Sequence, residues 1–86
     1  MDCPEIESLI RITFPDAQIQ VNSADLQHFS AIVLSESFAA QTLVIRQRRV
    51  YAALGTLLQD GTIHALQIYA YTPTEWQQRL STHQTE

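Results

Sequence analysis

Histidine is the residue type in this chain with the clearest capacity for metal chemistry. His64 stands at the entrance of an apolar stretch, His28 directly precedes another, and His83 lies in the polar C-terminal part. A neutral imidazole is a common metal ligand, but a protein site typically supplies three or four ligands. His64 therefore becomes a credible ligand only where a second protein completes the site. If His28 is not a ligand, we expect it to be a structural histidine held by hydrogen bonds. We expect His83 to be a solvated side chain.

The other reactive residue types do not suggest an enzyme. Cys3 is the single cysteine, so the chain has neither an internal disulfide nor a positioned Cys–His pair. Gly55 and Gly61 are the two glycines, and they are isolated, which excludes a glycine-rich nucleotide loop. No two carboxylates are spaced in a way that indicates a coupled acid and base. We therefore expect a binding or partner protein without catalytic activity.

Three arginines, Arg46, Arg48 and Arg49, form a local basic run in an otherwise acidic chain. The net charge is −4, and all five basic residues are arginines. An acidic domain is a poor general nucleic-acid binder, because phosphate neutralisation supplies most of the non-specific affinity. The run is either a solvated helix face or a docking surface for an anionic partner.

The length of 86 residues predicts one small domain. We expect this domain to span residues 1–82 and residues 83–86 to form a polar, disordered tail. No apolar run approaches the roughly 20 residues of a membrane helix, and the acidic N-terminus lacks the basic start of a signal peptide. A cytoplasmic protein, monomeric or weakly dimeric, is the expectation.

Periodicity and turn residues predict the order helix, strand, strand, helix, strand, helix. Pro4 and the apolar spacing from Ile6 to Phe14 indicate the first helix, and Thr72 to Glu75 is a capping box for the last. Two strands joined by a short turn should pair antiparallel, and the third, arriving by a helical crossover, should run parallel to one of them. The predicted strands are residues 17–22, 28–34 and 62–71, the last of these following a helix over residues 41–58.

The long helix over residues 41–58 should bury one apolar stripe. We place Gly55 inside this helix, where close packing would explain it, and Arg46 and Arg49 mainly outside the stripe. Phe38 should turn inward from the preceding loop or single helical turn. The predicted stripe consists of Leu43 or Val44, then Val50, Leu54, Leu57 and Leu58. The fold class is therefore α+β, a three-stranded mixed sheet with helices packed on it.

Several short motifs, in this order and spacing, resemble the BolA family over about Ile19 to Trp76, and most closely its short IbaG-type bacterial members. Each motif alone is weak, but the ordered set is specific. The motifs are His28-Phe29, Ser35-x-x-Phe38, Arg46-x-Arg48 before Val50-Tyr51-x-x-Leu54, Ile63-His64-Ala65-Leu66 and Tyr71-Thr72-Pro73-x-Glu75-Trp76.

The resemblance implies an αββαβα fold similar to a class II KH domain. It also implies partnership with a monothiol glutaredoxin of the Cys-Gly-Phe-Ser type, in a heterodimer whose [2Fe–2S] cluster is held by the glutaredoxin cysteine, glutathione and the BolA-like chain. The histidine ligand of the family falls on His64. No cluster is expected in the isolated chain.

Two departures from the family pattern affect the second ligand. Longer BolA proteins carry an extra His or Cys between the first two strands, but residues 22–27 hold neither, and Gln47 replaces a family histidine. The resemblance places His28 on a different, strand-entry histidine of the family. Two alternatives follow: His64 holds the cluster together with a weak second ligand, for which His28 is the candidate, or the partnership forms without a cluster.

The alternative function is that of a KH-like, nucleic-acid-binding transcriptional regulator of stress response and morphology. Arg46, Arg48 and Arg49 would then form its binding surface. Against it, residues 35–41 contain no Gly-x-x-Gly backbone clamp of the KH type.

Overall fold

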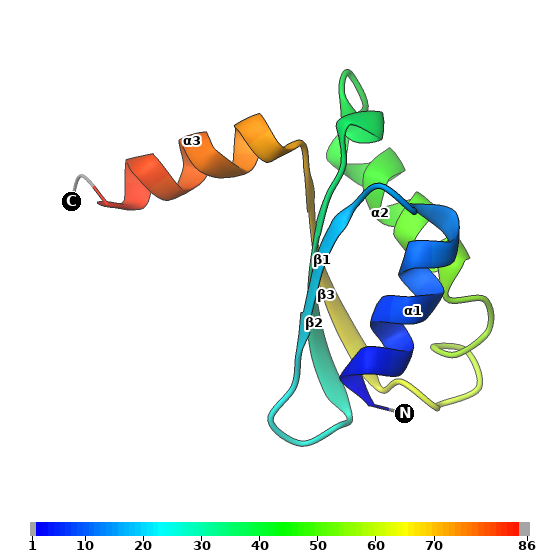
Figure 1. The fold of residues 1–86 in the computed structure, drawn as a ribbon. Helices are drawn as coiled ribbons and strands as arrows, with labels where there is room; N and C mark the ends of the chain where they lie inside the picture. The colour runs from blue at the N-terminus through cyan, green and yellow to red at the C-terminus, as the bar shows by residue number, and fades with distance from the viewer. Residues whose placement is uncertain (1, 85–86) are drawn as a thin grey trace.

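Two helices cover one face of a three-stranded sheet, and a third helix extends away from the sheet's end (Figure 1). The computed structural model describes residues 2–84. The predicted αββαβα order is confirmed. The elements are α1 (Cys3–Thr13), β1 (Gln18–Asn22), β2 (His28–Leu34), a 3₁₀ turn η1 (Glu36–Phe38), α2 (Leu43–Ala53), β3 (Ala65–Tyr71) and α3 (Pro73–Gln84).

Strand β2 is the centre of the sheet. It pairs antiparallel with β1, joined to it by a short loop, and parallel with β3, reached through the α2 crossover. The parallel register places His28 opposite Ala65 and Leu34 opposite Tyr71. The mixed sheet expected from the connections is therefore confirmed.

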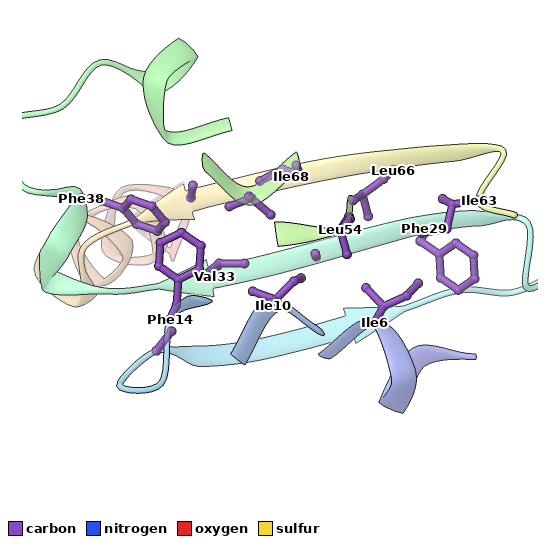
Figure 2. Close-up of a cluster of buried hydrophobic side chains, with 14 residues drawn as sticks. Ile6, Ile10, Phe14, Phe29, Val33, Phe38, Leu54, Ile63, Leu66 and Ile68 are labelled. Carbon is purple, nitrogen blue, oxygen red and sulfur yellow. The ribbon is translucent and has the colours of Figure 1, made fainter. Parts of the chain in front are cut away.

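The core lies between the sheet and helices α1 and α2 (Figure 2). Alternate residues of β2 and β3 point into it, which is the period of a strand with one buried face. Phe38 is fully buried, as expected, and its ring centroid lies 5.2 Å from the ring centroid of Phe14. The core residues from the strands are Phe29, Ala31, Val33, Leu66, Ile68 and Ala70, and those from the helices include Ile6, Ile10, Val50 and Leu54.

The first helix forms where capping and apolar spacing agree. The Asp2 side chain accepts a hydrogen bond from the Glu5 backbone N–H at 3.0 Å, and Pro4 lies in the first turn. Ile6 and Ile10, four residues apart, are fully buried against the sheet. The helix ends at Thr13, with Phe14 as its C-cap.

Helix α3 begins with the predicted capping box. The Glu75 N–H donates to Thr72 Oγ1 at 3.2 Å, and the Thr72 N–H donates to Glu75 Oε1 at 2.8 Å. The helix continues to Gln84, so residues 83 and 84 of the expected tail are helical, while residues 85 and 86 lie outside the described part of the chain. No helix within residues 2–84 is long and apolar enough to cross a bilayer.

The prediction for the long helix was wrong at its C-terminal end. Helix α2 stops at Ala53, and Gly55 adopts a left-handed φ of 64°, a conformation that glycine adopts without a Cβ penalty. Gly55 thus follows the helix instead of lying within it. Close packing is not the reason for the glycine, because an added Cβ would meet no heavy atom within 4 Å.

The predicted stripe is confirmed at Val50 and Leu54, and Leu57 and Leu58 pack partly buried against the core, but its first member is wrong. The buried positions are Arg46, Val50 and Leu54, each four residues after the last, whereas Leu43 and Val44 are 53% and 58% exposed. These two residues occupy the first turn of a helix that begins only at Leu43. Strand β3 likewise begins later than expected, at Ala65.

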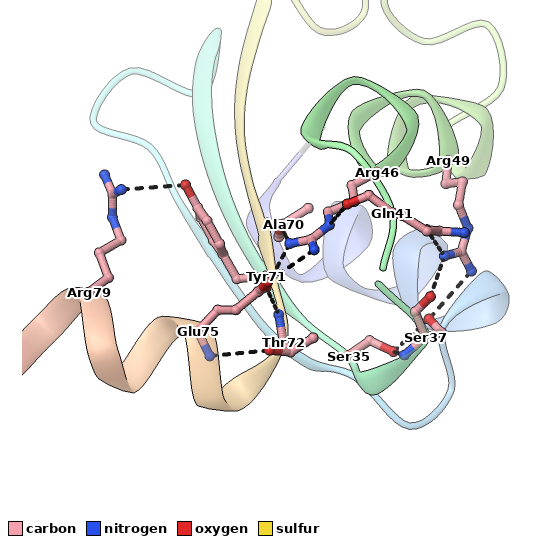
Figure 3. Close-up of polar contacts among 10 residues, drawn as sticks. All are labelled: Ser35, Ser37, Gln41, Arg46, Arg49, Ala70, Tyr71, Thr72, Glu75 and Arg79. Carbon is pink, nitrogen blue, oxygen red and sulfur yellow. Dashed lines mark hydrogen bonds and ion pairs between the residues drawn. The ribbon is translucent and has the colours of Figure 1, made fainter. Parts of the chain in front are cut away.

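Arg46 is a buried structural residue (Figure 3), which corrects its assignment to a binding surface. Its guanidinium forms a bidentate pair with Glu75, with Nη1 2.7 Å from Oε1 and Nη2 3.1 Å from Oε2. Nη1 also donates to the Ala70 carbonyl and Nε to the Gln41 carbonyl. This one side chain therefore ties α2 to the end of β3 and the start of α3.

We predict that Arg46→Ala lowers the free energy of unfolding by about 2–3 kcal/mol, because the two backbone carbonyls and the Glu75 carboxylate lose their charged donor. Arg48→Ala is the matched control, since Arg48 is exposed on the same helix and should change stability by less than about 0.5 kcal/mol. Denaturant unfolding of both variants measures this difference. Equal stabilities would contradict the structural role of Arg46.

Glu75 predicts an acid-dependent component of stability. Hydrogen bonds from the Arg46 guanidinium, and then from the Thr72 N–H, lower the pKa of Glu75 from 4.5 to about 2. A lowered folded-state pKa contributes stability above the unfolded value, and this stability is lost as pH falls from about 4.5 through about 2. Unfolding free energies measured across this window should fall more steeply for the wild type than for Glu75→Gln. If the unfolding free energies of the two proteins changed with pH in parallel, the Arg46–Glu75 pair would not hold the Glu75 carboxylate ionised.

Candidate functional site

The loop before β2 is held in one shape by its own side chains. Asp25 Oδ1 accepts hydrogen bonds from the N–H groups of Gln27, at 3.0 Å, and His28, at 2.9 Å. Ser23 Oγ donates to the His28 carbonyl at 2.7 Å and lies 2.9 Å from the donating N–H of Leu26, whose φ is 59°. The start of β2, and with it His28, is therefore fixed by the turn.

The Gln27 carbonyl joins this loop to the segment that enters β3. It accepts hydrogen bonds from the backbone N–H groups of His64, at 3.1 Å, and Ala65, at 3.2 Å. Since His28 is the register partner of Ala65, the two histidines leave neighbouring chain segments at the same end of the sheet. The parallel pairing of β2 and β3 thus brings together residues that are far apart in the sequence.

The imidazole rings of His28 and His64 lie 6.3 Å apart between centroids, with an angle of 82° between their planes. Both residues are exposed. The His64 side chain is exposed, and none of the residues 2–84 forms a hydrogen bond with its ring. This is the accessibility that a ligand shared with a second protein requires. The third histidine, His83, lies in α3.

Asp25 orients the His28 ring. His28 Nδ1 lies 2.8 Å from Asp25 Oδ2. The pKa of Asp25 is held well below its usual value, first by the backbone N–H of His28, then by the His28 ring and the Gln27 N–H. An ionised carboxylate only accepts, so Nδ1 carries the proton of this bond and Nε2 is the outward nitrogen. A carboxylate behind an imidazole is common in metal sites, and the same bond suits a purely structural histidine.

Sequence reasoning missed this role of Asp25. The signal was available, because an aspartate in a turn three residues before a histidine can bond both the backbone and the ring.

The described chain does not complete a metal site by itself. No group of three His, Cys, Asp or Glu side chains comes together within residues 2–84. Cys3 is half-buried and packs against the hydrophobic core. The two imidazoles fit the ligand chemistry of one iron of a cluster whose other ligands come from outside. They are too few to hold a cluster without a partner.

Arg49 also has structural contacts. Its Nη1 donates to the Ser37 carbonyl at 3.0 Å and to Gln41 Oε1 at 2.7 Å (Figure 3), and its guanidinium lies over the rings of Phe14 and Phe38. Of the three arginines expected to form one surface, only Arg48 is exposed. The expected basic surface is therefore much reduced.

A family model described as BolA-like protein matches residues 13–75. The chain belongs to the BolA family. The resemblance indicated by the ordered motifs is thus confirmed, as is the BolA-like fold.

Acid stress protein IbaG and a BolA homologue of known structure are among the relatives that match most of the chain. Acid stress protein IbaG of Escherichia coli strain K12 is 37% identical over 76 residues, which cover 88% of this chain and 89% of that protein. The structure of a BolA protein homologue from Coxiella burnetii superposes with a TM-score of 0.76 at 35% identity, covering 90% of this chain and 97% of that one.

A third relative matches a shorter part. The DNA-binding transcriptional regulator BolA of E. coli strain K12 is 34% identical over 50 residues, which cover 58% of this chain and 47% of that protein.

Proposed function

We propose that this BolA-family protein is a non-enzymatic partner of a monothiol glutaredoxin in iron–sulfur trafficking or iron regulation, and that it contributes His64 to a shared [2Fe–2S] cluster. The observation that carries the proposal is an exposed imidazole without a hydrogen-bond partner among residues 2–84, in a chain whose described side chains cannot complete a metal site. The motif around His64 is where the family resemblance places the ligand. The missing ligands would be the glutaredoxin cysteine and glutathione.

A histidine at this position suits a cluster that is passed on. Replacing a thiolate by a neutral imidazole removes negative charge from one iron and raises the reduction potential. Only the unprotonated ring binds metal, so ligation weakens on acidification. His64 is held by its backbone N–H while its ring stays exposed, so the ring can join and leave a site at the surface of a second protein.

His28 is the candidate for a second ligand from this chain. Its ring neighbours His64 and is oriented by Asp25, with Nε2 pointing away from the carboxylate. The loop over residues 23–27 offers no other His or Cys. A pair of imidazoles would give one iron the ligand set of a Rieske-type centre.

The nucleic-acid alternative has weaker support. Its support is the name of the E. coli regulator, which aligns with little more than half of this chain. Arg46 is buried and Arg49 is engaged with η1 and the core, so Arg48 is the exposed member of the basic run. With a net charge of −4, this leaves little positive surface for a phosphate backbone.

The test is assembly of the mixed complex. The protein, a monothiol glutaredoxin, glutathione, iron and sulfide are combined under anaerobic conditions, and the visible absorption and circular dichroism spectra are compared with those of the glutaredoxin homodimer. The wild type should give a distinct mixed-complex spectrum, because an imidazole replaces a thiolate, and His64→Ala should abolish it.

His83→Ala is the control for this assembly, since it removes a histidine in α3 and should leave the spectrum unchanged. A His64→Ala complex with the wild-type spectrum would refute the assignment of the ligand. A protein that never alters the spectrum of the homodimer would refute the partnership.

A further inference from the structure

The two edges of the sheet differ in how the rest of the chain engages them. Strand β3 forms one edge and β1 the other, with β2 between them. On the β3 edge, the Tyr51 hydroxyl donates to the Leu66 carbonyl at 3.2 Å. Arg46 Nη1 donates to the Ala70 carbonyl, also at 3.2 Å. Side chains of α2 thus occupy backbone acceptors of β3, and covering an edge with a helix is one way to keep it from pairing with another chain.

The hydrogen bonds at the two ends of the β2–β3 ladder show which backbone groups of β2 are left for β1. At one end, the Ala65 N–H donates to the Gln27 carbonyl. At the other end, the Ser35 N–H donates to the Tyr71 carbonyl. The bonding residues of a ladder alternate along the strand. The odd-numbered residues of β2 therefore bond β3, and the even-numbered residues bond β1.

The outer edge of β1 carries the backbone groups of Ile19 and Val21. The antiparallel register pairs even-numbered residues of β1 with even-numbered residues of β2, as in Gln20 opposite Ile32. These pairs exchange their hydrogen bonds, so the N–H and C=O groups of Ile19 and Val21 point away from β2. Within residues 2–84, no other strand pairs with this edge.

The composition of β1 suits an identical strand. Its sequence is Gln-Ile-Gln-Val-Asn, without the charged residues or proline that commonly protect an edge. Since each chain has a net charge of −4, two copies repel each other, and an uncharged edge is a place where they can meet without like charges directly opposite. Ile19 and Val21 already pack partly buried against the core, so a strand added here extends the same apolar layer.

An antiparallel pair of two β1 strands uses every outward group when its twofold axis passes through Gln20. Ile19 then lies opposite Val21 of the second copy and exchanges both hydrogen bonds with it, and the axis repeats this pair. On the uncovered face, Gln20 lies opposite Gln20 of the second copy, and Gln18 lies opposite Asn22. Their amide side chains can both donate and accept, so the facing pairs are complementary.

Arg11 favours this register. Its Nη1 donates to the carbonyl of Ala17, the outward-facing residue that precedes β1, at 3.1 Å. A register shifted toward Ala17 would have to displace this bond. The axis at Gln20 leaves it intact and pairs the groups that remain.

We propose that the free edge of β1 binds a second copy of this chain, and that the two β1 strands pair antiparallel to give one sheet that continues across the dimer. The inference goes beyond the proposed function, because His64 precedes β3 at the opposite edge and stays exposed in the dimer. Two five-residue strands make a small interface. We therefore expect a dimer that forms as the protein concentration rises.

Sedimentation equilibrium of the whole protein over a wide concentration range, combined with a charge exchange at Gln20, tests the dimer. Gln20 is exposed, so Gln20→Glu and Gln20→Lys each place like charges opposite each other on the axis without burying them. Each variant alone should dimerise at least about fivefold more weakly than the wild type, and an equal mixture of the two should recover the dimer. Gln67→Glu is the matched control, since Gln67 is exposed in β3 and should leave dimerisation unchanged.

Amide hydrogen exchange locates the interface. The N–H groups of Ile19 and Val21 should exchange at least about tenfold more slowly in the dimer than at low concentration, because they then donate to the second copy. The N–H groups of Gln18 and Gln20, which bond β2 in the monomer, should change little.

A protein that stays monomeric over the whole range would overturn the inference. A dimer whose Ile19 and Val21 amides stay unprotected would also overturn it, as would one that Gln20→Glu leaves unchanged, because its interface would lie elsewhere. Protection of these amides only after addition of the glutaredoxin would assign the edge to that partner and contradict the dimer. The mixed-complex spectra report on His64, so they decide the proposed function separately.

Discussion

The parallel pairing of β2 with β3 is the constraint on which the candidate site depends. The pairing begins where the Gln27 carbonyl accepts hydrogen bonds from two successive N–H groups, those of His64 and Ala65, and it continues to Leu34 opposite Tyr71. Because the register is fixed along the whole ladder and one face of it is buried, a one-residue slip would turn the core residues of β3 outward. The position of His64 beside His28 is thus secured by burial of one face along the whole of β3.

The two ends of this ladder have different physical characters. At the carboxyl end of β3, Arg46 joins the Ala70 carbonyl to Glu75, so a buried charge is satisfied and the last helix is fixed at its start. At the amino end, the histidines and Asp25 lie at the surface. The carboxyl end of β3 is thus stabilised by the Arg46 guanidinium, which the sequence analysis assigned to a binding surface. The end with open polar chemistry is the one where the proposed partner would bind.

The sequence predicts what depends on local patterns. The order of elements, the bounds of β2, the inward Phe38 and the capping box at Thr72 follow from periodicity and turn chemistry. Sequence patterns fail to predict features that depend on residues far apart in the chain. Arg46 was expected to face solvent, because its acceptor Glu75 comes close to it only in the folded structure. Gly55 looks like an interior glycine because the apolar pattern continues past the end of α2. The proximity of His28 and His64 could not be predicted from the sequence either, because it depends on the register between β2 and β3.

Nuclear Overhauser spectroscopy of the isolated protein measures most directly whether the two histidines form one site. The edge-on ring contact predicts cross-peaks between the ring protons of His28 and His64, and a shift of the His64 ring signals in His28→Gln. Absence of these cross-peaks in a folded protein that retains the β2–β3 ladder, with His64 signals unaffected by the substitution, would contradict a common site for the two imidazoles.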